Sequence, residues 1–399
     1  MALDNPQAIL TSPTPVRVAF CHYTADVGGG SDKALLDLVA HLPRDRFIPS
    51  MILKPDDPMA PAYRSAGIEV VQVPLVHPRR ALEWGRLVQY FLHFWPSTFK
   101  VAHAIRRLDA DVVHVNTLFN IQGAVAARLA RRPLVWHVRE IVPGSRLVAV
   151  MLGLVRILAN RAVAISSAVA ETLQGCGNRL HIVFDGIDLD PYQDLDGGPV
   201  RDALRLGPEQ PVVTTVGRIE PWKGQRTLVD AAPAILSAYP DAHILIVGGV
   251  AVNKPAYAQD LRQRCEDLGI AGNVHFTGIR DDVPAVLAAS SVLVLPTATP
   301  EPFGLTVPEA MAAGCPVVAT AAGGPLDTVV DGETGYLVAP NDPAALAEKV
   351  CAVLADPARA RAMGESGRRR AARLFSIERV AREMGELFAE TAAEMRLHR

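Results

Sequence analysis

Two cations stand close together in a loop bounded by glycines and could bind a diphosphate. The segment reads G-R-I-E-P-W-K-G, and it places Arg218 and Lys223 directly after a run of strand-forming residues. An arginine offers a planar fork of donors and a lysine a compact charge, a combination that suits neighbouring phosphates. Only six of the 40 basic residues are lysines, so a lysine is an unusual choice here. We call residues 217–224 the cationic loop; the alternative interpretation is a solvated surface loop.

Two carboxylates lie further along the chain, in E-P-F-G-L-T-V-P-E-A-M. Glu301 precedes a predicted helix and Glu309 lies about one turn inside it, so both can face one ligand across the helix start. The amides of Phe303, Gly304 and Leu305 stand at that start, where the helix dipole favours an anion. With the cationic loop, these residues indicate one site for a phosphorylated ligand.

Glycines at strand ends would let the backbone approach a phosphate closely. They form two groups, which are Gly28, Gly29 and Gly30 after the first predicted strand and Gly248 and Gly249 in the second half. A dinucleotide fingerprint counted from Gly28 would require glycine at position 33, where Lys33 stands. The sequence therefore disfavours a redox enzyme that binds a dinucleotide.

Strand-like runs rich in Val and Ile alternate with amphipathic segments of helical length, a pattern typical of parallel strands joined by crossover helices. The predicted strands cover residues 16–20, 47–53, 68–75, 112–116, 134–138, 162–166, 181–184, 212–217, 243–249, 274–278, 292–296, 316–320 and 336–338. The fold class expected is α/β, with two Rossmann-like doubly wound domains that face a central cleft. Ligands bind such folds at the carboxyl ends of the strands, where the chemical groups above are predicted to lie.

The length of 399 residues exceeds what a single core supports, so two domains are expected. The pattern predicts a Rossmann-like domain over residues 1–190, a hinge over 191–210, a second Rossmann-like domain over 211–375, and a C-terminal helix over 376–399 that packs back on the first domain. The hinge is expected where Pro, Gly and polar residues interrupt the alternation.

Composition excludes several classes of protein. The chain is 49% hydrophobic and carries 40 basic against 42 acidic residues, which argues against a disordered chain and against a nucleic-acid-binding surface. Five scattered cysteines form no C-x-x-C pair, so neither a disulfide framework nor a zinc site is predicted. No signal peptide or membrane-spanning run is evident, and a cytoplasmic protein is expected, peripheral to the inner face of a membrane if it contacts one.

In the order and spacing of five motifs, the chain resembles the retaining nucleotide-sugar glycosyltransferases of family 4, the glycosyl transferases group 1. These motifs are GRIEPWKG, VGG, VHFTG, EPFGLTVPEAMAAGCPVVAT and a final GG at 323–324. The resemblance covers nearly the whole chain and is most specific in its second half. It implies a GT-B fold. It also implies a retaining hexosyltransferase that moves a sugar from a UDP- or GDP-linked donor to an acceptor hydroxyl, with the N-terminal domain on the acceptor side.

The resemblance also implies roles for individual residues. Arg218 and Lys223 correspond to the pair that neutralises the donor diphosphate. Glu301 corresponds to the glutamate that orients the transferred sugar, and Glu309 to the one that holds the ribose hydroxyls. The helix-start amides would lie near the β-phosphate and the sugar, and the segment from Thr277 to Arg280 would line the base pocket. The three consecutive glycines of the first half would approach the donor phosphates and the acceptor.

The chain departs from the family pattern at two places. The family's histidine near the reacting carbon aligns with Arg139, whereas His137 lies two residues earlier. Alternate residues of a strand share a face, so either side chain could reach the cleft; His137 could equally be a core residue. Glu140 is a further cleft candidate. In the turn F-D-G-I-D, Asp185 replaces the family's asparagine.

No catalytic metal is predicted, and no cofactor besides the nucleotide sugar. A metal-dependent transferase would need a carboxylate pair at the carboxyl end of a strand, whereas D-A-D at 109–111 precedes its predicted strand. The aspartate pair Asp188/Asp190 lies just before the predicted hinge, and the pair Asp194/Asp196 lies within it. The positive field would come from Arg218, Lys223 and helix N-termini.

One basic, aromatic segment, residues 79–107, gives an indication of the kind of acceptor. Its aromatic residues are Trp84, Tyr90, Phe91, Phe94, Trp95 and Phe99, and its flanking cations are Arg79, Arg80, Arg86, Lys100, Arg106 and Arg107. Such a helix could rest on a membrane or receive a lipid-linked acceptor. The stripe of Trp84, Val88, Phe91 and Trp95 could instead pack on the sheet, and Pro96 is predicted to break the helix. Glycan and small-molecule acceptors fit the sequence as well.

Two alternative functions remain compatible with the sequence. One is a nucleotide-sugar 2-epimerase of the same architecture, which needs no acceptor. The other is a catalytically silent GT-B binding module; the departure from the family pattern at Arg139 is the only feature of the sequence that favours it.

Overall fold

The computed structural model describes residues 14–24, 29–75, 84–142, 144–252 and 254–397, with the backbone alone over 84–91. The chain divides into two compact units. The first unit holds residues 1–186 and 377–399, and the second holds residues 187–376. Each unit contains its own cluster of buried apolar side chains, so each has a core of its own.

The first unit is built on a seven-stranded parallel sheet with the order β3-β2-β1-β4-β5-β6-β7. Its strands are β1 Val16–Cys21, β2 Phe47–Leu53, β3 Glu69–Gln72, β4 Val112–Asn116, β5 Leu134–Val138, β6 Arg161–Ala164 and β7 Leu180–Ile182. The central strands are rich in buried valine, as expected of a parallel sheet that helices cover on both faces. The strand order reverses between β1 and β4, so the loops that follow these two strands meet at a switch point.

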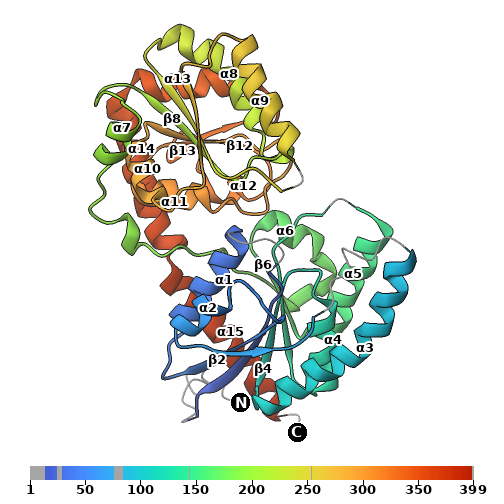
Figure 1. Ribbon diagram of the computed structural model, residues 1–399. Coiled ribbons are helices and arrows are strands. Elements are labelled where there is room, and N and C mark those ends of the chain that lie inside the picture. The colour runs from blue at the N-terminus through green and yellow to red at the C-terminus, as the bar shows by residue number, and fades with distance from the viewer. Residues whose placement is uncertain (1–13, 25–28, 76–83, 143, 253, 398–399) are drawn as a thin grey trace. The chain divides into compact units, whose positions relative to one another are not determined.

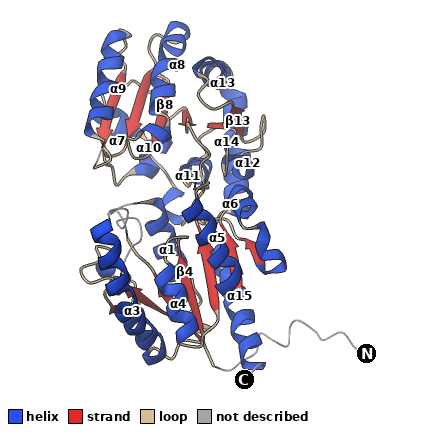
Figure 2. Cartoon of the chain, turned by 90° about the vertical axis from the view of Figure 1, so that its right-hand side faces the viewer, coloured by secondary structure: helices blue, strands red, loops and turns tan. Residues whose placement is uncertain are grey.

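Helices flank this sheet on both sides (Figures 1 and 2). They are α1 Gly30–His41, α2 Ala60–Ser65, α3 Trp84–Arg107, α4 Ile121–Leu129, α5 Arg146–Leu158, α6 Ser167–Thr172, the 3-10 helix η3 Gln174–Arg179 and α15 Ile377–Leu397. Side chains of α1, α2 and α15 form the core of one face with β1, β2 and β4. Helix α4 contacts both α3 and α5. These three form the layer on the other face.

The second unit contains a six-stranded parallel sheet with the order β10-β9-β8-β11-β12-β13. Its strands are β8 Val212–Val216, β9 His243–Val247, β10 Val274–Gly278, β11 Val292–Leu295, β12 Val317–Thr320 and β13 Gly335–Val338. Its helices are η4 Asp190–Tyr192, α7 Gly198–Ala203, η5 Pro221–Lys223, α8 Gln225–Ala238, α9 Pro255–Asp267, α10 Val283–Ala289, α11 Thr306–Ala313, α12 Pro325–Thr328, α13 Pro343–Ala355 and α14 Pro357–Leu374. The order reverses between β8 and β11, which places a second switch point there.

The chain passes between the units at 186/187 and returns at 376/377. Residues 191–210, the predicted hinge, lie inside the second unit rather than between the two. Val200 and Leu206 of this segment are buried in a small apolar cluster with Val212 and Leu245, and this burial is the physical reason why the segment belongs there. The C-terminal helix α15 lies in the first unit and packs against α1.

Helix α3 runs through Pro96 instead of ending there, so the predicted helix break is wrong. Proline removes one backbone donor from a helix, so the carbonyl of Leu92, four residues before Pro96, loses its helical partner. In the following turn Thr98 Oγ1 donates to the carbonyl of Phe94 at 2.6 Å. Phe94 is buried, whereas Trp95 is 51% exposed and therefore does not belong to a packed stripe. The side chains of the other stripe members lie outside the described residues. No helix in the described part of the chain has the length and apolar character that a membrane span requires.

Candidate active site

Lys223 and Glu301 meet at the switch point of the second unit. Lys223 ends η5 in the loop after β8, and Glu301 lies in the loop after β11, the neighbouring strand. Lys223 Nζ donates to Glu301 Oε2 at 2.8 Å, and the two side chains are 20% and 7% exposed. The ammonium also lies 4.0 Å from the centre of the Trp222 ring. A carboxylate and an aromatic face therefore hold the one lysine of the cationic loop in place.

Gly224 explains why the two loops approach so closely. It has a left-handed φ of +70° and directly precedes α8. A Cβ at this position would lie 1.8 Å from the carbonyl oxygen of Pro296, at the end of β11. Only glycine allows the backbone of the cationic loop to lie on the end of the neighbouring strand.

Arg218 occupies the outer part of the cationic loop. Its side chain is 43% exposed, and its Nε donates to Glu220 Oε1 at 3.1 Å. Gln225 Nε2 donates to the Arg218 carbonyl at 2.9 Å and so fixes the backbone there. The loop thus presents one ordered, partly buried cation and one exposed cation, and both pair with a glutamate.

The backbone of Glu301 is clamped by the loop after β12. Its N–H donates to the Ala322 carbonyl at 3.2 Å, and its own carbonyl accepts from Gly324 N–H at 2.7 Å. Gly323 has a φ of +80°, and a Cβ there would lie 2.1 Å from the Glu301 carbonyl oxygen. The pair of glycines at 323–324 is therefore needed to position the carboxylate, a role that sequence reasoning did not assign.

The start of α11 adjoins this carboxylate. Gly304 has a φ of +82°, and a Cβ at this position would lie 3.2 Å from Glu301 Cγ. Phe303 is buried, with its ring edge-on to Phe375 at 5.8 Å, so only its backbone can serve a ligand. Leu305 is the N-cap of α11, and Glu309 lies in the first turn and is 8% exposed. The predicted helix start is thus present beside Glu301.

The loops after β9 and β10 complete this edge of the sheet. Gly248 donates its N–H to the Gly278 carbonyl at 2.9 Å, and a Cβ on it would lie 2.1 Å from the Gly217 carbonyl oxygen. A Cβ on Gly249 would lie 2.8 Å from Ile279 Cγ1. Arg280 forms a two-point ion pair with Asp282, at 2.8 and 2.5 Å. This hydrogen bonding raises the pKa of Arg280 and holds its side chain toward Asp282.

In the first unit, a buried pair stands at the switch point between β1 and β4. His22 Nε2 lies 2.8 Å from Asp32 Oδ1, and Asn116 Nδ2 lies 3.2 Å from His22 Nδ1. Asp32 belongs to the first turn of α1, for which Gly29 is the N-cap and Gly30 the first residue; Gly28 lies outside the described residues. Sequence reasoning missed this pair. Two features of the sequence could have indicated the pair: an aspartate two residues after the glycines, and a histidine directly after the first strand.

His137 lies in the buried interior of the first unit. It is 2% exposed, and its Nδ1 is 3.2 Å from Nε2 of His114, which packs on Phe20 and Phe388. Burial, the charge of Arg139 and the neighbouring His114 lower the pKa of His137 well below its usual value. Both rings are therefore neutral at pH 7, and His137 occupies the position of a core residue.

Arg139 follows β5 and is also buried. Its Nη2 donates to Asp185 Oδ2 at 2.5 Å, and the two side chains are 4% and 6% exposed. Glu140 braces the same loop, because its Oε2 accepts from Leu118 N–H at 3.0 Å and from the Arg139 N–H at 3.2 Å. Thr117 donates to the other carboxylate oxygen of Glu140.

The D-A-D carboxylates are engaged by arginines. Asp109 pairs with Arg132 at 3.0 Å and Asp111 with Arg396 at 2.9 Å, at the amino end of β4. Among the described residues, no group of three or more His, Cys, Asp or Glu side chains has a metal-binding arrangement.

Two family models match successive parts of the chain: Glycosyltransferase Family 4 over residues 28–191 and Glycosyl transferases group 1 over residues 199–370. One similar curated protein is the GDP-mannose-dependent alpha-(1-6)-phosphatidylinositol monomannoside mannosyltransferase of Mycolicibacterium smegmatis, 39% identical over 46% of this chain and 49% of that protein. Another is the D-inositol 3-phosphate glycosyltransferase of Corynebacterium urealyticum, 34% identical over 53% of this chain and 51% of that protein. The matched segments thus span about half the length of these curated relatives.

Among solved structures, Anabaena Alr3699/HepE in complex with UDP and glucose has a TM-score of 0.81 and 26% identity over 93% of this chain and 99% of its own. The same Anabaena protein has also been solved in complex with UDP-glucose. These similarities establish that both units have the Rossmann-like folds of GT-B proteins.

Proposed function

Because the chain has the GT-B fold and each half matches a glycosyltransferase family model, we propose that it transfers a sugar from a nucleoside diphosphate sugar to an acceptor hydroxyl. The observation that carries this proposal is the Lys223–Glu301 pair, held at 2.8 Å at the switch point between β8 and β11. Open parallel sheets bind phosphorylated ligands at such a point.

The ion pair suggests how the donor is received. A diphosphate is a stronger partner for Lys223 than a single carboxylate, because it carries more charge and more acceptor oxygens. When the donor binds, Lys223 would turn to the diphosphate and stabilise the leaving group, with Arg218 at its exposed side. Glu301 would then be free to accept hydrogen bonds from the sugar hydroxyls.

The remaining donor contacts follow from the neighbouring loops. The start of α11 offers amides and the positive end of its dipole to the β-phosphate. Glu309 in the first turn of α11 would accept the ribose hydroxyls, and the segment that ends at Arg280 would line the base pocket. We propose UDP or GDP as the nucleotide, because a similar structure contains UDP-glucose and a similar curated protein uses GDP-mannose.

We propose transfer with retention and without a catalytic metal. Retention through a covalent intermediate would need a carboxylate at the anomeric carbon to act as nucleophile. Glu301 is instead assigned to the sugar hydroxyls and is bound to Lys223. The acceptor would attack from the face that the diphosphate leaves, and the leaving phosphate would take the acceptor's proton. Cations and amides placed beforehand would stabilise the developing charge.

Proton NMR of the products tests this reaction. The protein would be incubated with UDP-glucose or GDP-mannose, alone and with inositol 3-phosphate or phosphatidylinositol monomannoside as acceptor, since the names of the relatives suggest these compounds. A new glycoside with the donor's anomeric configuration is expected. A 2-epimer formed from donor alone would identify the epimerase instead, and intact donors in every mixture would favour the silent binding module.

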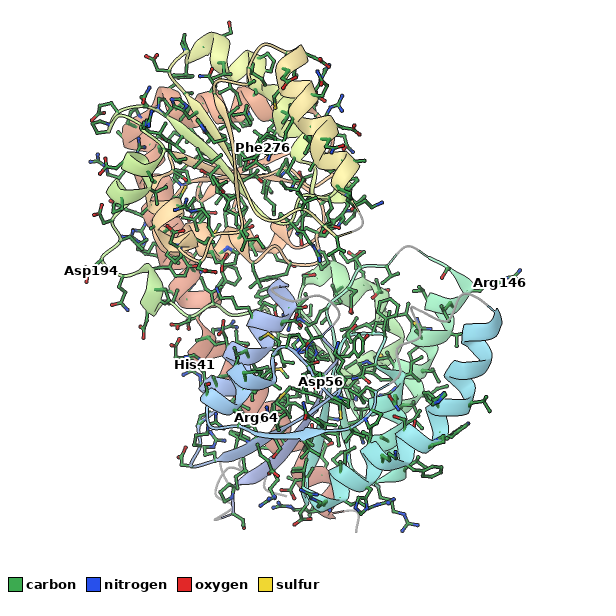
Figure 3. The ribbon with its side chains drawn as sticks, in the orientation of Figure 1. His41, Asp56, Arg64, Arg146, Asp194 and Phe276 are labelled. Carbon is green, nitrogen blue, oxygen red and sulfur yellow. The ribbon has the colours of Figure 1, made fainter. Side chains whose placement is uncertain are left out.

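We propose further that the α3–α4–α5 layer contacts an anionic membrane, which extends the expectation for residues 79–107. Apolar side chains are exposed at helical spacing on two of its helices: Leu92, Trp95 and Phe99 on α3, and Leu147, Val150 and Ile157 on α5. The three helices contain seven cations and neither aspartate nor glutamate: Arg86, Lys100, Arg106, Arg107, Arg128, Arg146 and Arg156. In Figure 3, Arg146 points outward at the start of α5. Exposed apolar groups on helices that carry cations and no acidic residue suit an anionic lipid surface.

Vesicle co-sedimentation tests this surface. We expect the protein to bind vesicles that contain phosphatidylglycerol and to bind phosphatidylcholine vesicles weakly. The double variant Trp95→Ser/Phe99→Ser should lose on the order of tenfold or more in binding, because two large apolar groups no longer enter the lipid. Leu397→Ser, at an 85% exposed apolar residue outside the layer, is the matched control. Equal binding to both vesicle types would contradict the proposal.

A further inference from the structure

Helix α11, whose start adjoins Glu301, is held at its other end by an arginine of α14. An α-helix leaves its last four carbonyls without partners inside the helix. In α11 the first two of these carbonyls accept from the N–H of Gly314. Arg368 Nε and Nη2 donate to the other two, those of Ala312 and Ala313, at 3.2 and 3.0 Å. Arg368 therefore completes the end of a helix of eight residues.

Two glycines let α14 lie directly against this end of α11. A Cβ on Gly364 would lie 2.0 Å from the carbonyl oxygen of Gly314, and a Cβ on Gly314 would lie 2.6 Å from Arg368 Nη2. A side chain at Gly364 would push α14 away from α11, and one at Gly314 would displace the guanidinium. The contact between the two backbones thus sets the distance at which Arg368 reaches the last carbonyls of α11.

Helix α12, which directly follows the glycine turn at 323–324, is held in the same way. Arg370 Nε donates to the Thr328 carbonyl at 2.8 Å, and its Nη2 donates to the Asp327 carbonyl at 2.7 Å. The turn before α12 clamps the backbone of Glu301, because its second glycine donates to the Glu301 carbonyl at 2.7 Å. Arg370 therefore holds the far end of the element that positions this carboxylate.

The charge of each arginine acts in the same direction as its hydrogen bonds. A cation at the C-terminal end of a helix compensates the negative end of the helix dipole. The two ends of α11 are only about 12 Å apart, because each residue of a helix adds about 1.5 Å. The guanidinium of Arg368 therefore also favours an anion at the start of α11, where we place the β-phosphate.

We propose that Arg368 and Arg370 are positioning residues of the donor site, which act through α11 and α12 respectively. Arg368 fixes the amides at the start of α11 for the diphosphate. Arg370 fixes the glycine turn and, through it, Glu301 for the sugar. Both act from the far ends of the helices and do not contact the substrate. The effects on binding and turnover rest on the proposed function, whereas the order of α11 and α12 in the free protein does not.

Hydrogen exchange tests the hold on the two helices without any substrate. Methionine at either position keeps an unbranched apolar chain but removes the donors and the charge. Mass spectrometry of the free protein should show amide exchange that is about threefold faster or more, over residues 304–310 in Arg368→Met and over residues 321–328 in Arg370→Met. The acceleration should reach the start of each helix, not only the end that the arginine contacts.

Binding and kinetics separate the two paths. Arg368→Met should weaken the binding of UDP or GDP by about threefold to tenfold, because the amides that receive the diphosphate lose their fixed position. Arg370→Met should lower kcat for transfer by a similar factor and leave nucleotide affinity nearly unchanged, because Glu301 contacts the sugar and not the diphosphate. Arg368→Lys retains the charge and should recover part of the lost affinity.

Arg369→Met is the matched control. Arg369 lies between the two arginines and donates to Ser366 Oγ at 3.0 Å, within α14 itself. This variant should keep the native exchange, affinity and kcat. The proposal is overturned if Arg368→Met and Arg370→Met lower Tm but keep the native affinity and kcat. A native protein that binds neither nucleotide would contradict the proposed function, and the exchange rates would still decide whether the arginines hold α11 and α12.

Discussion

The ion pair between Lys223 and Glu301 fixes the position of both side chains before a substrate binds. The pair is bordered by the Trp222 ring on one side and by the glycine turn at 323–324 on the other. Preorganisation of this kind matters because a charge that is already oriented needs no reorganisation in the transition state. The scarcity of lysine in the sequence singled out Lys223, but its direct contact with Glu301, 78 residues away, required the structure.

Replacing Glu301 by glutamine separates binding from catalysis. The variant keeps a hydrogen-bonding side chain but loses the charge, so transfer should fall by about 10²–10³-fold, the range seen when one transition-state contact is removed. The affinity for UDP or GDP should change little, since Lys223 stays available to the diphosphate. Glu348→Gln is the control, because Glu348 pairs with Lys349 at 2.9 Å on the exposed surface of the same unit. Steady-state kinetics in which the two variants behave alike would argue against the assigned role of Glu301.

At the scale of elements, left-handed glycines determine how closely the loops of the second unit can approach. Gly224→Ala should destabilise the unit by more than the about 1–2 kcal/mol that a left-handed conformation costs a non-glycine residue, because its Cβ would also clash with Pro296. Gly332→Ala is the matched control, since Gly332 has a φ of +76° and open space around its Cβ position. Thermal unfolding should show a clearly larger decrease in Tm for Gly224→Ala. Equal decreases would mean that the loop can move away from β11.

The histidine pair between β4 and β5 predicts a pH dependence. Burial, with the charges of Arg139 and His22, lowers the pKa of His114 from 6.5 to about 3, and the pKa of His137 is lowered as well. The unfolded chain takes up protons on both rings below pH 6.5 and the folded chain does not, so the free energy of unfolding should decrease as pH falls from 6.5 toward 3.

His114→Phe should reduce the contribution of the pair to this slope to about half, because one of the two titrating groups is removed. The phenylalanine would pack against Phe20 and Phe388, the rings that His114 contacts. Urea unfolding at several pH values measures the slope, with His41→Phe, at an exposed histidine of α1, as the control. A slope unchanged by His114→Phe would show that the folded chain protonates His114 as readily as the unfolded chain, and would contradict the lowered pKa.

Strand periodicity is a local property, and the sequence therefore predicted all thirteen strands of the two sheets. The largest difference is at β3, which ends at Gln72 instead of residue 75, because Pro74 has no N–H for the ladder. Contacts between distant residues were not predictable in this way. The His22–Asp32 and Arg139–Asp185 pairs join residues 10 and 46 positions apart, and no periodicity encodes such pairings.

For the whole molecule, each unit has one switch point, and the polar groups of each gather at the carboxyl ends of its strands. The near-neutral net charge of −2 conceals an uneven distribution. The cationic loop supplies charge at the donor edge, and the α3–α4–α5 layer is basic without any acidic residue in its helices. Donor affinity should therefore depend on a few local cations rather than on a basic surface.

Isothermal titration calorimetry of UDP and GDP tests the central claim that the cationic loop binds the donor diphosphate. We expect the native protein to bind one of the two nucleotides with one site per chain, and Lys223→Ala to weaken this binding on the order of tenfold or more, because one charge-assisted contact is lost. Lys349→Ala, an exposed lysine of the same unit, should bind like the native protein. If neither nucleotide binds, or if Lys223→Ala binds as tightly as Lys349→Ala, the donor site is not where we place it.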